Sequence, residues 1–193
     1  MDTKLSMATN FIRYFVEPGD TVFDVGANIG QKADLYLAAG AKVICFEPQP
    51  DCLTILTQKY QQNPNAFIVN KGLGEQAGTM QLSVCSDANY ISTFSQKWKT
   101  GRFANYDWNQ TVTVEITTLD EMIKLWGCPK FCKIDVEGFE HQVLKGLSIP
   151  IPYISFEFAI EFIEDTKNCI SHLKSLGYKV FNIAKGEASN LVF

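Results

Sequence analysis

A glycine-containing turn near the N-terminus is the first stretch whose residue types suggest ligand chemistry. Residues 22–30 read VFDVGANIG, an apolar run that leads into Asp24, Gly26, Ala27, Asn28 and Gly30. Gly26 permits a positive φ and a close approach of backbone to ligand, and Gly30 lets a following helix pack tightly. Asn28 stands where a dinucleotide-binding turn needs the glycine that makes room for a pyrophosphate. The turn therefore favours a nucleoside cofactor without a pyrophosphate, with Asp24 near its cationic end; a tight turn capped by an aspartate is the alternative.

An acidic residue ends the second apolar run. Residues 43–48 read VICFEP, which places Glu47 23 positions after Asp24. A carboxylate at such a strand end can accept hydrogen bonds from both hydroxyls of a ribose, and Pro48 fixes the chain direction beyond it. A surface glutamate is the alternative for this motif alone. The two motifs at this spacing together favour nucleoside binding.

A third motif connects the sequence to a known family. Residues 133–146 read KIDVEGFEHQVLKG. Taken in order with VFDVGANIG and FEP, this segment resembles the FkbM family of S-adenosylmethionine-dependent methyltransferases over residues 20–160. The resemblance implies a class I methyltransferase fold with S-adenosyl-L-methionine as cofactor. It also implies O-methylation of a hydroxyl on a sugar, glycan, lipid or secondary metabolite.

The resemblance further implies roles for individual residues. Asp135 matches the acidic residue beside the methionyl group and the transferred methyl, Glu137 and Gly138 complete the hallmark, and Glu157 resembles the acidic end of the following strand. The adenine is expected beside the third strand end, where small residues would let a purine stack on backbone. The residues expected to bind the cofactor are Asp24, Gly26, Ala27, Asn28, Gly30, Glu47, Pro48, Lys71, Gly72 and Asp135.

Methyl transfer to a neutral hydroxyl requires a group that removes the proton. A carboxylate within hydrogen-bond reach can accept it, especially where burial raises its pKa. Asp135, Glu137 and Glu157 are the candidate catalytic residues, because all three are expected at neighbouring strand ends. Glu137 could instead cap a helix, and Glu157 could pair with a lysine. Paired carboxylates could also hold a divalent cation, but the sequence contains no dedicated metal motif and we expect no metal.

Alternating strand and helix patterns show which elements must position these residues. Apolar runs at 21–25, 42–46, 66–70, 131–134 and 153–158 alternate with helical periodicities. The pattern predicts an α/β, Rossmann-like fold with a mainly parallel seven-stranded sheet, helices on both faces, and ligands at the carboxyl ends of the strands. Residues 79–117 break the pattern and are expected to form a β-hairpin insertion after the third strand. Residues 178–183 and 191–193 could close a terminal antiparallel pair.

The connection inside this insertion, residues 85–110, is unusual for a methyltransferase core. It interleaves aromatic and basic side chains: Tyr90, Phe94, Trp98, Phe103, Tyr106 and Trp108 with Lys97, Lys99 and Arg102. Aromatic faces can stack on a sugar and cations can bind an anionic acceptor, so the segment could cover the substrate. A long connection held down by its own aromatics is the alternative.

Composition limits the class of protein. The 193 residues fit one domain, 46% of them are hydrophobic, and the net charge of −4 with a pI of about 5.2 argues against a general nucleic-acid or anionic-membrane binder. No apolar run approaches a membrane span, and the N-terminus lacks a signal-peptide core, so we expect a cytoplasmic protein with reduced cysteines. An N-terminal helix is expected within residues 1–18. It could cover the cofactor side, cover a sheet edge, or contact a second subunit in a homodimer.

Three functions from different classes are consistent with these features. The first is a methyltransferase whose partner is a small-molecule or glycan hydroxyl acceptor. The second is an NAD-dependent oxidoreductase, which Glu47 supports and Asn28 opposes. The third is a non-catalytic nucleoside-binding domain, although such a domain would not need the matched acidic residues.

Overall fold

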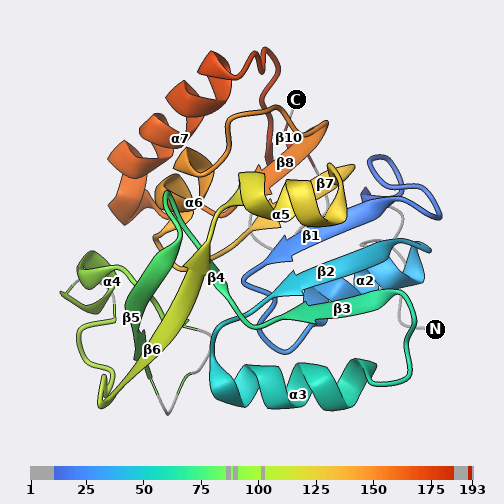
Figure 1. Cartoon of the computed structure of the whole chain (residues 1–193). Helices are drawn as coiled ribbons and strands as arrows, with labels where there is room; N and C mark the ends of the chain where they lie inside the picture. The colour runs from blue at the N-terminus through green and yellow to red at the C-terminus, as the bar shows by residue number, and fades with distance from the viewer. Residues whose placement is uncertain (1–10, 86–87, 89–90, 101–102, 185–190, 193) are drawn as a thin grey trace.

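The central element of the fold is a parallel β-sheet. The computed structural model describes residues 11–85, 88, 91–100, 103–184 and 191–192. Five strands lie in the order β3-β2-β1-β7-β8, and every neighbouring pair is parallel (Figure 1). In chain order these strands are β1 Thr21–Val25, β2 Lys42–Phe46, β3 Ala66–Val69, β7 Phe131–Ile134 and β8 Tyr153–Phe156.

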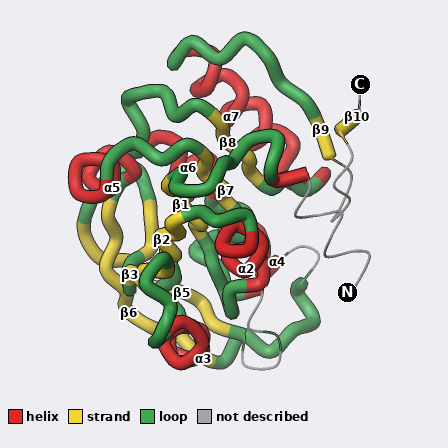
Figure 2. The backbone as a smooth tube through the Cα atoms, turned by 90° about the vertical axis from the view of Figure 1, so that its right-hand side faces the viewer, coloured by secondary structure: helices red, strands yellow, loops and turns green. Residues whose placement is uncertain are grey.

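The predicted helices cover both faces of this sheet. Alternate side chains of β1 and β2, including Phe23 and Ile44, pack against α5 Leu119–Trp126, α6 Glu140–Lys145 and α7 Ile163–Ser175. The intervening side chains, including Val22 and Val43, pack against α2 Gln31–Ala38 and α3 Pro50–Tyr60. Figure 2 shows α2 and α5 on opposite sides of the sheet. The strands are mostly apolar because both of their faces are buried; Asp24 of β1 and Lys133 of β7 are buried charged exceptions.

The strand order reverses between β1 and β7. The chain leaves β1 towards β2 and β3 on one side, and later returns to add β7 and β8 on the other. The loops after β1 and β7 therefore diverge, which opens a crevice at the carboxyl ends of these two strands. Val25 pairs with Ile134, so the residues that follow, Gly26 and Asp135, lie side by side. The fold thus joins two sequence motifs that are more than a hundred residues apart.

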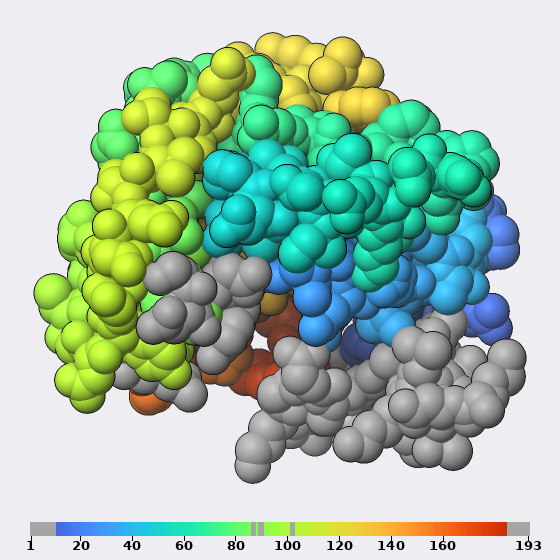
Figure 3. All heavy atoms as spheres, turned by 90° about the horizontal axis from the view of Figure 1, so that it is seen from below, coloured from blue at the N-terminus to red at the C-terminus, as the bar shows by residue number. Residues whose placement is uncertain are grey.

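The insertion after the third strand builds a second, smaller sheet. It contains β4 Gly72–Leu73, β5 Gly78–Val84 and β6 Gln110–Thr117 in the order β4-β6-β5, with β5 and β6 antiparallel. A short helix, α4 Gln96–Thr100, lies in the connection between the two long strands. Viewed from below, the inserted strands in green to yellow stand beside the end of α3 in cyan (Figure 3).

The sheet differs from the predicted seven strands at its β8 edge. The terminal strands, β9 Ile183–Ala184 and β10 Leu191–Val192, form the expected antiparallel pair, but in the described chain they pair only with each other. After α7 the Tyr178 hydroxyl accepts a hydrogen bond from the Ile151 backbone N–H at 2.9 Å, and the next six residues are exposed. The chain therefore leaves the sheet before it can extend it.

Other expectations for the elements can be compared with the described residues. The predicted capping box is present, since the Thr118 hydroxyl accepts a hydrogen bond from the Glu121 backbone N–H at 3.1 Å at the start of α5. Most of the N-terminal helix expected within residues 1–18 lies outside the described residues. Near the end of that segment, Ile12 and Val16 are described, and both are buried on the α2 face of the sheet. None of the helices in the described ranges is both long and apolar enough to cross a membrane.

Candidate functional site

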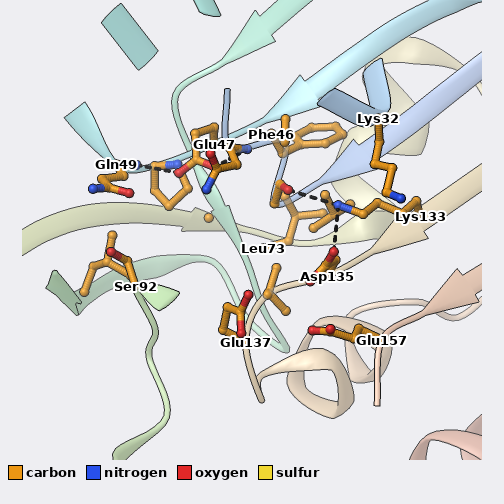
Figure 4. Close-up of a pocket in the computed structure, with 18 of the residues that line it drawn as sticks. Lys32, Phe46, Glu47, Gln49, Leu73, Ser92, Lys133, Asp135, Glu137 and Glu157 are labelled. Carbon is orange, nitrogen blue, oxygen red and sulfur yellow. Dashed lines mark hydrogen bonds and ion pairs between the residues drawn. The ribbon is translucent and has the colours of Figure 1, made fainter. Parts of the chain in front are cut away.

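The largest concentration of predicted site residues lies around a cavity of about 450 Å³. It opens at the carboxyl ends of β1, β2 and β7, with the small sheet as a further wall (Figure 4). Gly30 does not line it, and neither does Asp24. The predicted residues that do line it are Gly26, Ala27, Asn28, Glu47, Pro48, Lys71, Gly72, Asp135, Glu137 and Glu157.

Gly26 is required by the close approach of the neighbouring strand. Its φ is +76°, and a Cβ at this position would lie 1.9 Å from the carbonyl oxygen of Asp135. The backbone N–H groups of Gly26 and Ala27 both donate to the carbonyl oxygen of Phe46, at 3.0 and 3.1 Å. Gly26 therefore lets the ends of β1, β2 and β7 converge on one point at the cavity floor.

The second half of the turn shapes the start of α2. Asn28 has a φ of +50°, a conformation that asparagine tolerates better than most residues, and its Oδ1 accepts the Ile29 backbone N–H at 2.7 Å. Gly30 has a φ of +80°, and its carbonyl oxygen accepts a hydrogen bond from the Tyr60 hydroxyl at 2.8 Å. A Cβ on Gly30 would lie 2.4 Å from that hydroxyl oxygen. Gly30 thus serves helix packing, as the sequence suggested, but it has no surface in the cavity where the sequence also predicted it to bind the cofactor.

Glu47 is held rigidly at the cavity wall. Its two carboxylate oxygens accept hydrogen bonds from different backbone N–H groups, Oε2 from Asn28 at 2.8 Å and Oε1 from Gln49 at 2.9 Å. Burial raises the pKa of Glu47, and these two hydrogen bonds oppose that rise. Each oxygen keeps a free lone pair, so the carboxylate can still accept hydrogen bonds from two neighbouring hydroxyls.

Lys133 is a site residue that the sequence analysis did not single out. Its Nζ donates to the carbonyl oxygen of Gly26 at 3.1 Å, and it lies 3.4 Å from Asp24 Oδ1 and 3.3 Å from Asp135 Oδ2. Burial lowers the pKa of the Lys133 ammonium, but Asp24 and Asp135 together outweigh this effect, so the pKa is raised. The only signal in the sequence was a lysine within the apolar run of β7, since a lysine at a buried strand position requires charged partners.

Asp24 differs from its predicted placement near the ligand. Its side chain is fully buried, and burial raises its pKa while Lys133 lowers it. The residue lies on the α2 face of β1, behind Lys133, because side chains alternate along a strand and Phe23 and Val25 face the other way. Asp24 therefore does not line the cavity; it influences the cavity only by its ion pair with Lys133, which does.

The three predicted catalytic carboxylates do lie together. Asp135, Glu137 and Glu157 each place an oxygen within 4.8 Å of the others. Burial, followed by the neighbouring carboxylates, raises the pKa of Glu137 to about 9 and that of Glu157 to about 8. Figure 4 shows these side chains converging from the ends of β7 and β8. Three carboxyl groups this close cannot all be ionised together, so the cluster holds protons near neutral pH, and only a member that is ionised there can accept another. The spacing would also suit a cation bridging the three oxygens.

In the part of the chain that the structure describes, Glu137 and Glu157 do not form the helix cap and the lysine pair that were the alternatives to a catalytic role. The carboxylate that accepts hydrogen bonds from the turn before α6 is that of Glu140, not Glu137. Its Oε1 accepts from the backbone N–H of Val136 at 3.0 Å and from that of Gly138 at 3.3 Å. Glu157 forms no ion pair with a lysine within the described residues; its side chain hydrogen-bonds to Asp135. Both glutamates are therefore free of the structural roles that the sequence left open.

The inserted segment contributes cavity residues that the sequence did not identify individually. Leu82 from β5 and Ser92 and Phe94 from the following connection line the cavity. The Ser92 hydroxyl is buried and has no hydrogen-bond partner among the described residues. Phe94 packs against Phe139 with ring centroids 5.2 Å apart, and it is close to Gly72. The aromatic-basic composition indicated a role for this segment, but not which of its residues reach the cavity.

Comparison with models of known protein families shows to which family the chain belongs. The model of the methyltransferase FkbM domain matches residues 24–180, which include the glycine turn, Glu47, the carboxylate cluster and the inserted sheet. The chain belongs to the FkbM methyltransferase family. The family resemblance found in the sequence is thereby confirmed, and the FkbM-family motifs are those that the sheet brings together around the cavity.

Two curated relatives of this FkbM-family chain are methyltransferases. The hexuronic acid methyltransferase AglP of Haloferax volcanii is 29% identical over 147 residues, which cover 72% of this chain and 55% of the relative. The methyltransferase sdnD of Sordaria araneosa is 28% identical over 155 residues, covering 65% of this chain and 60% of the relative. The chain thus spans less than two thirds of the length of either relative.

Solved structures show the same fold at low sequence identity. A precorrin-6y C5,15-methyltransferase from Geobacter metallireducens matches 93% of this chain and 73% of its own, with a TM-score of 0.51 and 10% identity. A precorrin 8W decarboxylase from Methanobacterium thermoautotrophicum matches 92% of this chain and 77% of its own, with a TM-score of 0.50 and 13% identity. The predicted Rossmann-like methyltransferase fold of this FkbM-family chain is therefore confirmed.

Proposed function

We propose that this chain binds S-adenosyl-L-methionine in the cavity and transfers its methyl group to a hydroxyl of a sugar or glycan. The observation that carries the proposal is the division of one cavity into two ends. Glu47 stands at one end with two oxygens oriented for hydroxyls, and Asp135, Glu137 and Glu157 stand at the other. Family membership supports both the cofactor and the reaction class.

The cavity fits the cofactor in shape and in polar groups. Its volume of about 450 Å³ lies in the range of small-ligand sites. Glu47 would bind the ribose hydroxyls, and the apolar side chains of Leu73, Leu82 and Phe94, with the buried Ser92 hydroxyl among them, suit a purine with polar edges. The carboxylates at the other end suit a ligand with a positive charge.

The residues of the chain would contribute to the reaction mainly through position and charge. When bound, the cofactor supplies an electrophilic methyl group on a sulfonium. Lys133 fixes the carboxylate of Asp135 beside the Gly26 turn, and this carboxylate would orient the methionyl end of the cofactor. A member of the Asp135–Glu137–Glu157 cluster that is ionised at the working pH would accept the proton of the acceptor hydroxyl, and a raised pKa makes such a carboxylate a stronger base.

The hexuronic acid substrate of the curated relative makes uronic acids the first acceptor class to test. The same chemistry applies to neutral sugar hydroxyls, so both belong in one panel. An NAD-dependent oxidoreductase has less support, because Asn28 occupies the turn position that a pyrophosphate needs.

Calorimetry and thermal unfolding test the cofactor, and label transfer tests the reaction. We expect S-adenosylhomocysteine to raise the free energy of unfolding by about 2.7 kcal/mol at 100 times its dissociation constant, and NAD to leave it unchanged. Stabilisation by NAD alone would overturn the proposal. Transfer of a labelled methyl group to a uronic acid or neutral glycoside, lost in Asp135→Asn, would support it. Cofactor binding without transfer to any hydroxyl acceptor would favour a non-catalytic nucleoside-binding domain.

A further inference from the structure

The strongest feature outside the family motifs is a hydrogen bond between the inserted segment and the loop of the carboxylate cluster. The Thr93 hydroxyl donates to the backbone carbonyl of Glu137 at 2.7 Å, across 44 residues of sequence. The same hydroxyl oxygen accepts the backbone N–H of Ser95 at 2.8 Å. The hydroxyl therefore donates its one hydrogen to Glu137 and accepts a hydrogen bond from Ser95, and the two bonds fix its direction.

Thr93 is itself held firmly by the small sheet. Its side chain is only 1% exposed. Its backbone exchanges two hydrogen bonds of 3.0 Å with Ser83 of β5, in an isolated antiparallel bridge. The Ser83 hydroxyl in turn accepts a hydrogen bond from Lys99 at 2.9 Å. The donor that meets Glu137 is thus anchored to a strand and is not on a freely moving loop.

Glu137 needs an anchor because its backbone is strained. It has a φ of +56°, a left-handed conformation that an L side chain other than asparagine, aspartate or histidine seldom adopts. Glu140 holds the loop from its other side by accepting the N–H groups of Val136 and Gly138, which leaves the Glu137 carbonyl to Thr93. Strained backbone of this kind persists only where the surrounding structure determines it.

We propose that Thr93 is a positioning residue of the methyl-transfer site: it holds the Glu137 backbone in its left-handed conformation and so keeps the Glu137 carboxylate against Asp135 and Glu157. The inference rests on the proposed function for its catalytic meaning. It assigns the insertion a part in building the site, in addition to walling the cavity. Loss of the Thr93 hydroxyl would let Glu137 relax to an ordinary φ and swing its carboxylate away from the cluster.

The environment of Glu137 supplies a direct readout. The charged groups that act on its carboxylate are Glu157 at the end of β8, Asp135 and Glu140 on its own loop and helix, and Lys133 on β7. Burial is the largest cause of the raised pKa of Glu137; the three carboxylates raise it further, and Lys133 lowers it. A carboxylate that leaves this cluster for solvent would titrate closer to its ordinary value near 4.5.

Carbon-13 NMR titration of the glutamate carboxyl groups tests the inference, with the Glu137 signal assigned by its absence in Glu137→Gln. We expect Glu137 to titrate at about 9 in the unaltered chain, and in Thr93→Ser, which keeps the hydroxyl. In Thr93→Val, which keeps the volume and loses the donor, the pKa should fall by at least one unit. Thr118→Val is the matched control, because it removes another structural hydroxyl contact, the cap of α5, away from the cavity. Should Thr93→Val not fold, Thr93→Cys, whose thiol is a weak donor, should lower the pKa of Glu137 in the same direction.

Binding of S-adenosylhomocysteine, measured by calorimetry, separates this inference from the proposed function. We expect the dissociation constant in Thr93→Val to stay within about threefold of the unaltered chain, because Glu47 and the Gly26 turn are unaffected. An unchanged Glu137 pKa in a folded Thr93→Val or Thr93→Cys would overturn the positioning role. Failure of every variant and of the unaltered chain to bind S-adenosylhomocysteine would instead overturn the proposed cofactor and leave the titration result valid.

Discussion

The Nζ atom of Lys133 lies 3.4 Å from Oδ1 of Asp24, and the Asp24 side chain is fully buried. The same ammonium is 3.3 Å from Asp135 and donates to the carbonyl oxygen of Gly26. One lysine of β7 therefore neutralises a carboxylate of β1 below the cavity and orients another at its edge. The positive charge from β7 and the buried negative charge from β1 are distant in the sequence, and the pairing of the two strands brings them together.

Lys133→Met should destabilise the protein strongly, because it leaves the buried Asp24 carboxylate without its ion-pair partner. Removal of one partner of a buried ion pair costs about 3–5 kcal/mol. Urea unfolding measures the change. Lys124→Met, at an exposed position of α5, is the control and should stay within about 0.5 kcal/mol. The double variant with Asp24→Asn should regain part of the loss; no recovery would show that the Asp24 charge is not the cause.

Glu47→Gln should weaken binding of S-adenosylhomocysteine by about tenfold or more. The amide cannot accept from Asn28, Gln49 and two ribose hydroxyls at once, and a hydrogen bond to a charged group contributes about 1.5–3 kcal/mol. Isothermal titration calorimetry measures the dissociation constant. Asp51→Asn, at the exposed start of α3, is the control and should bind normally. Equal affinity of Glu47→Gln and the unaltered chain would remove Glu47 from the ribose site.

The free energy of unfolding of the ligand-free protein should fall as the pH rises from 5.5 to 8.5. The pKa of Glu137 is raised to about 9 in the folded protein, whereas it lies near 4.5 in an unfolded chain. Between these values the folded state holds a proton that the unfolded state has released, so a higher pH favours unfolding. Urea unfolding at several pH values should show a smaller fall in Glu137→Gln. Glu161→Gln, at an exposed position, should keep the full dependence; a parallel pH profile in Glu137→Gln would contradict the raised pKa.

Gly26→Ala should be far more harmful than Gly19→Ala, although both glycines have a positive φ. An alanine in this conformation costs about 1–2 kcal/mol at either site. Only at Gly26 would the new Cβ also meet the Asp135 carbonyl oxygen, at 1.9 Å; around Gly19 nothing lies within 4 Å. Thermal unfolding and S-adenosylhomocysteine binding measure the two effects. Similar melting temperatures for the two variants would show that β1 and β7 can separate without cost.

Divalent cations should leave the melting temperature of the protein unchanged, because we expect no metal to bind. Asp135, Glu137 and Glu157 are close enough to share a cation, but the Lys133 ammonium already lies 3.3 Å from Asp135. Melting temperatures with millimolar magnesium, with manganese and with a chelator should agree. A shift with magnesium that Glu157→Gln abolishes would identify this cluster as a metal site.

Much of the architecture followed from the sequence because local patterns decide it. Apolar runs longer than an alternating strand predict strands buried on both faces, and the observed β1, β2, β3, β7 and β8 lie where the runs indicated. The capping box at Thr118 and the turn at Gly26 are also local, since each depends on residues a few positions apart. The number of strands in the sheet is not local: β9 and β10 pair with each other, because the chain turns away from β8 after Tyr178.

The carboxylate cluster was within reach of the sequence, because residues that follow neighbouring parallel strands must lie at the same sheet edge. Asp135 and Glu157 follow β7 and β8 and do lie at this edge. Asp24 does not line the cavity, because the residue stands within β1 and the alternation of the strand turns its side chain away. The role of Lys133 was not predictable in this way, because its buried partner Asp24 comes from another strand.

By itself, the sequence determined the fold class, the family and the positions of the acidic residues along the chain, because these depend on periodicity and on motifs of contiguous residues. Only the tertiary structure decided which side chains meet. The contacts of Thr93 with Glu137, and of Lys133 with Asp24, join residues 44 and 109 positions apart, and no local pattern specifies such pairs. They follow from the packing of the small sheet against the β7 loop and from the register between β1 and β7.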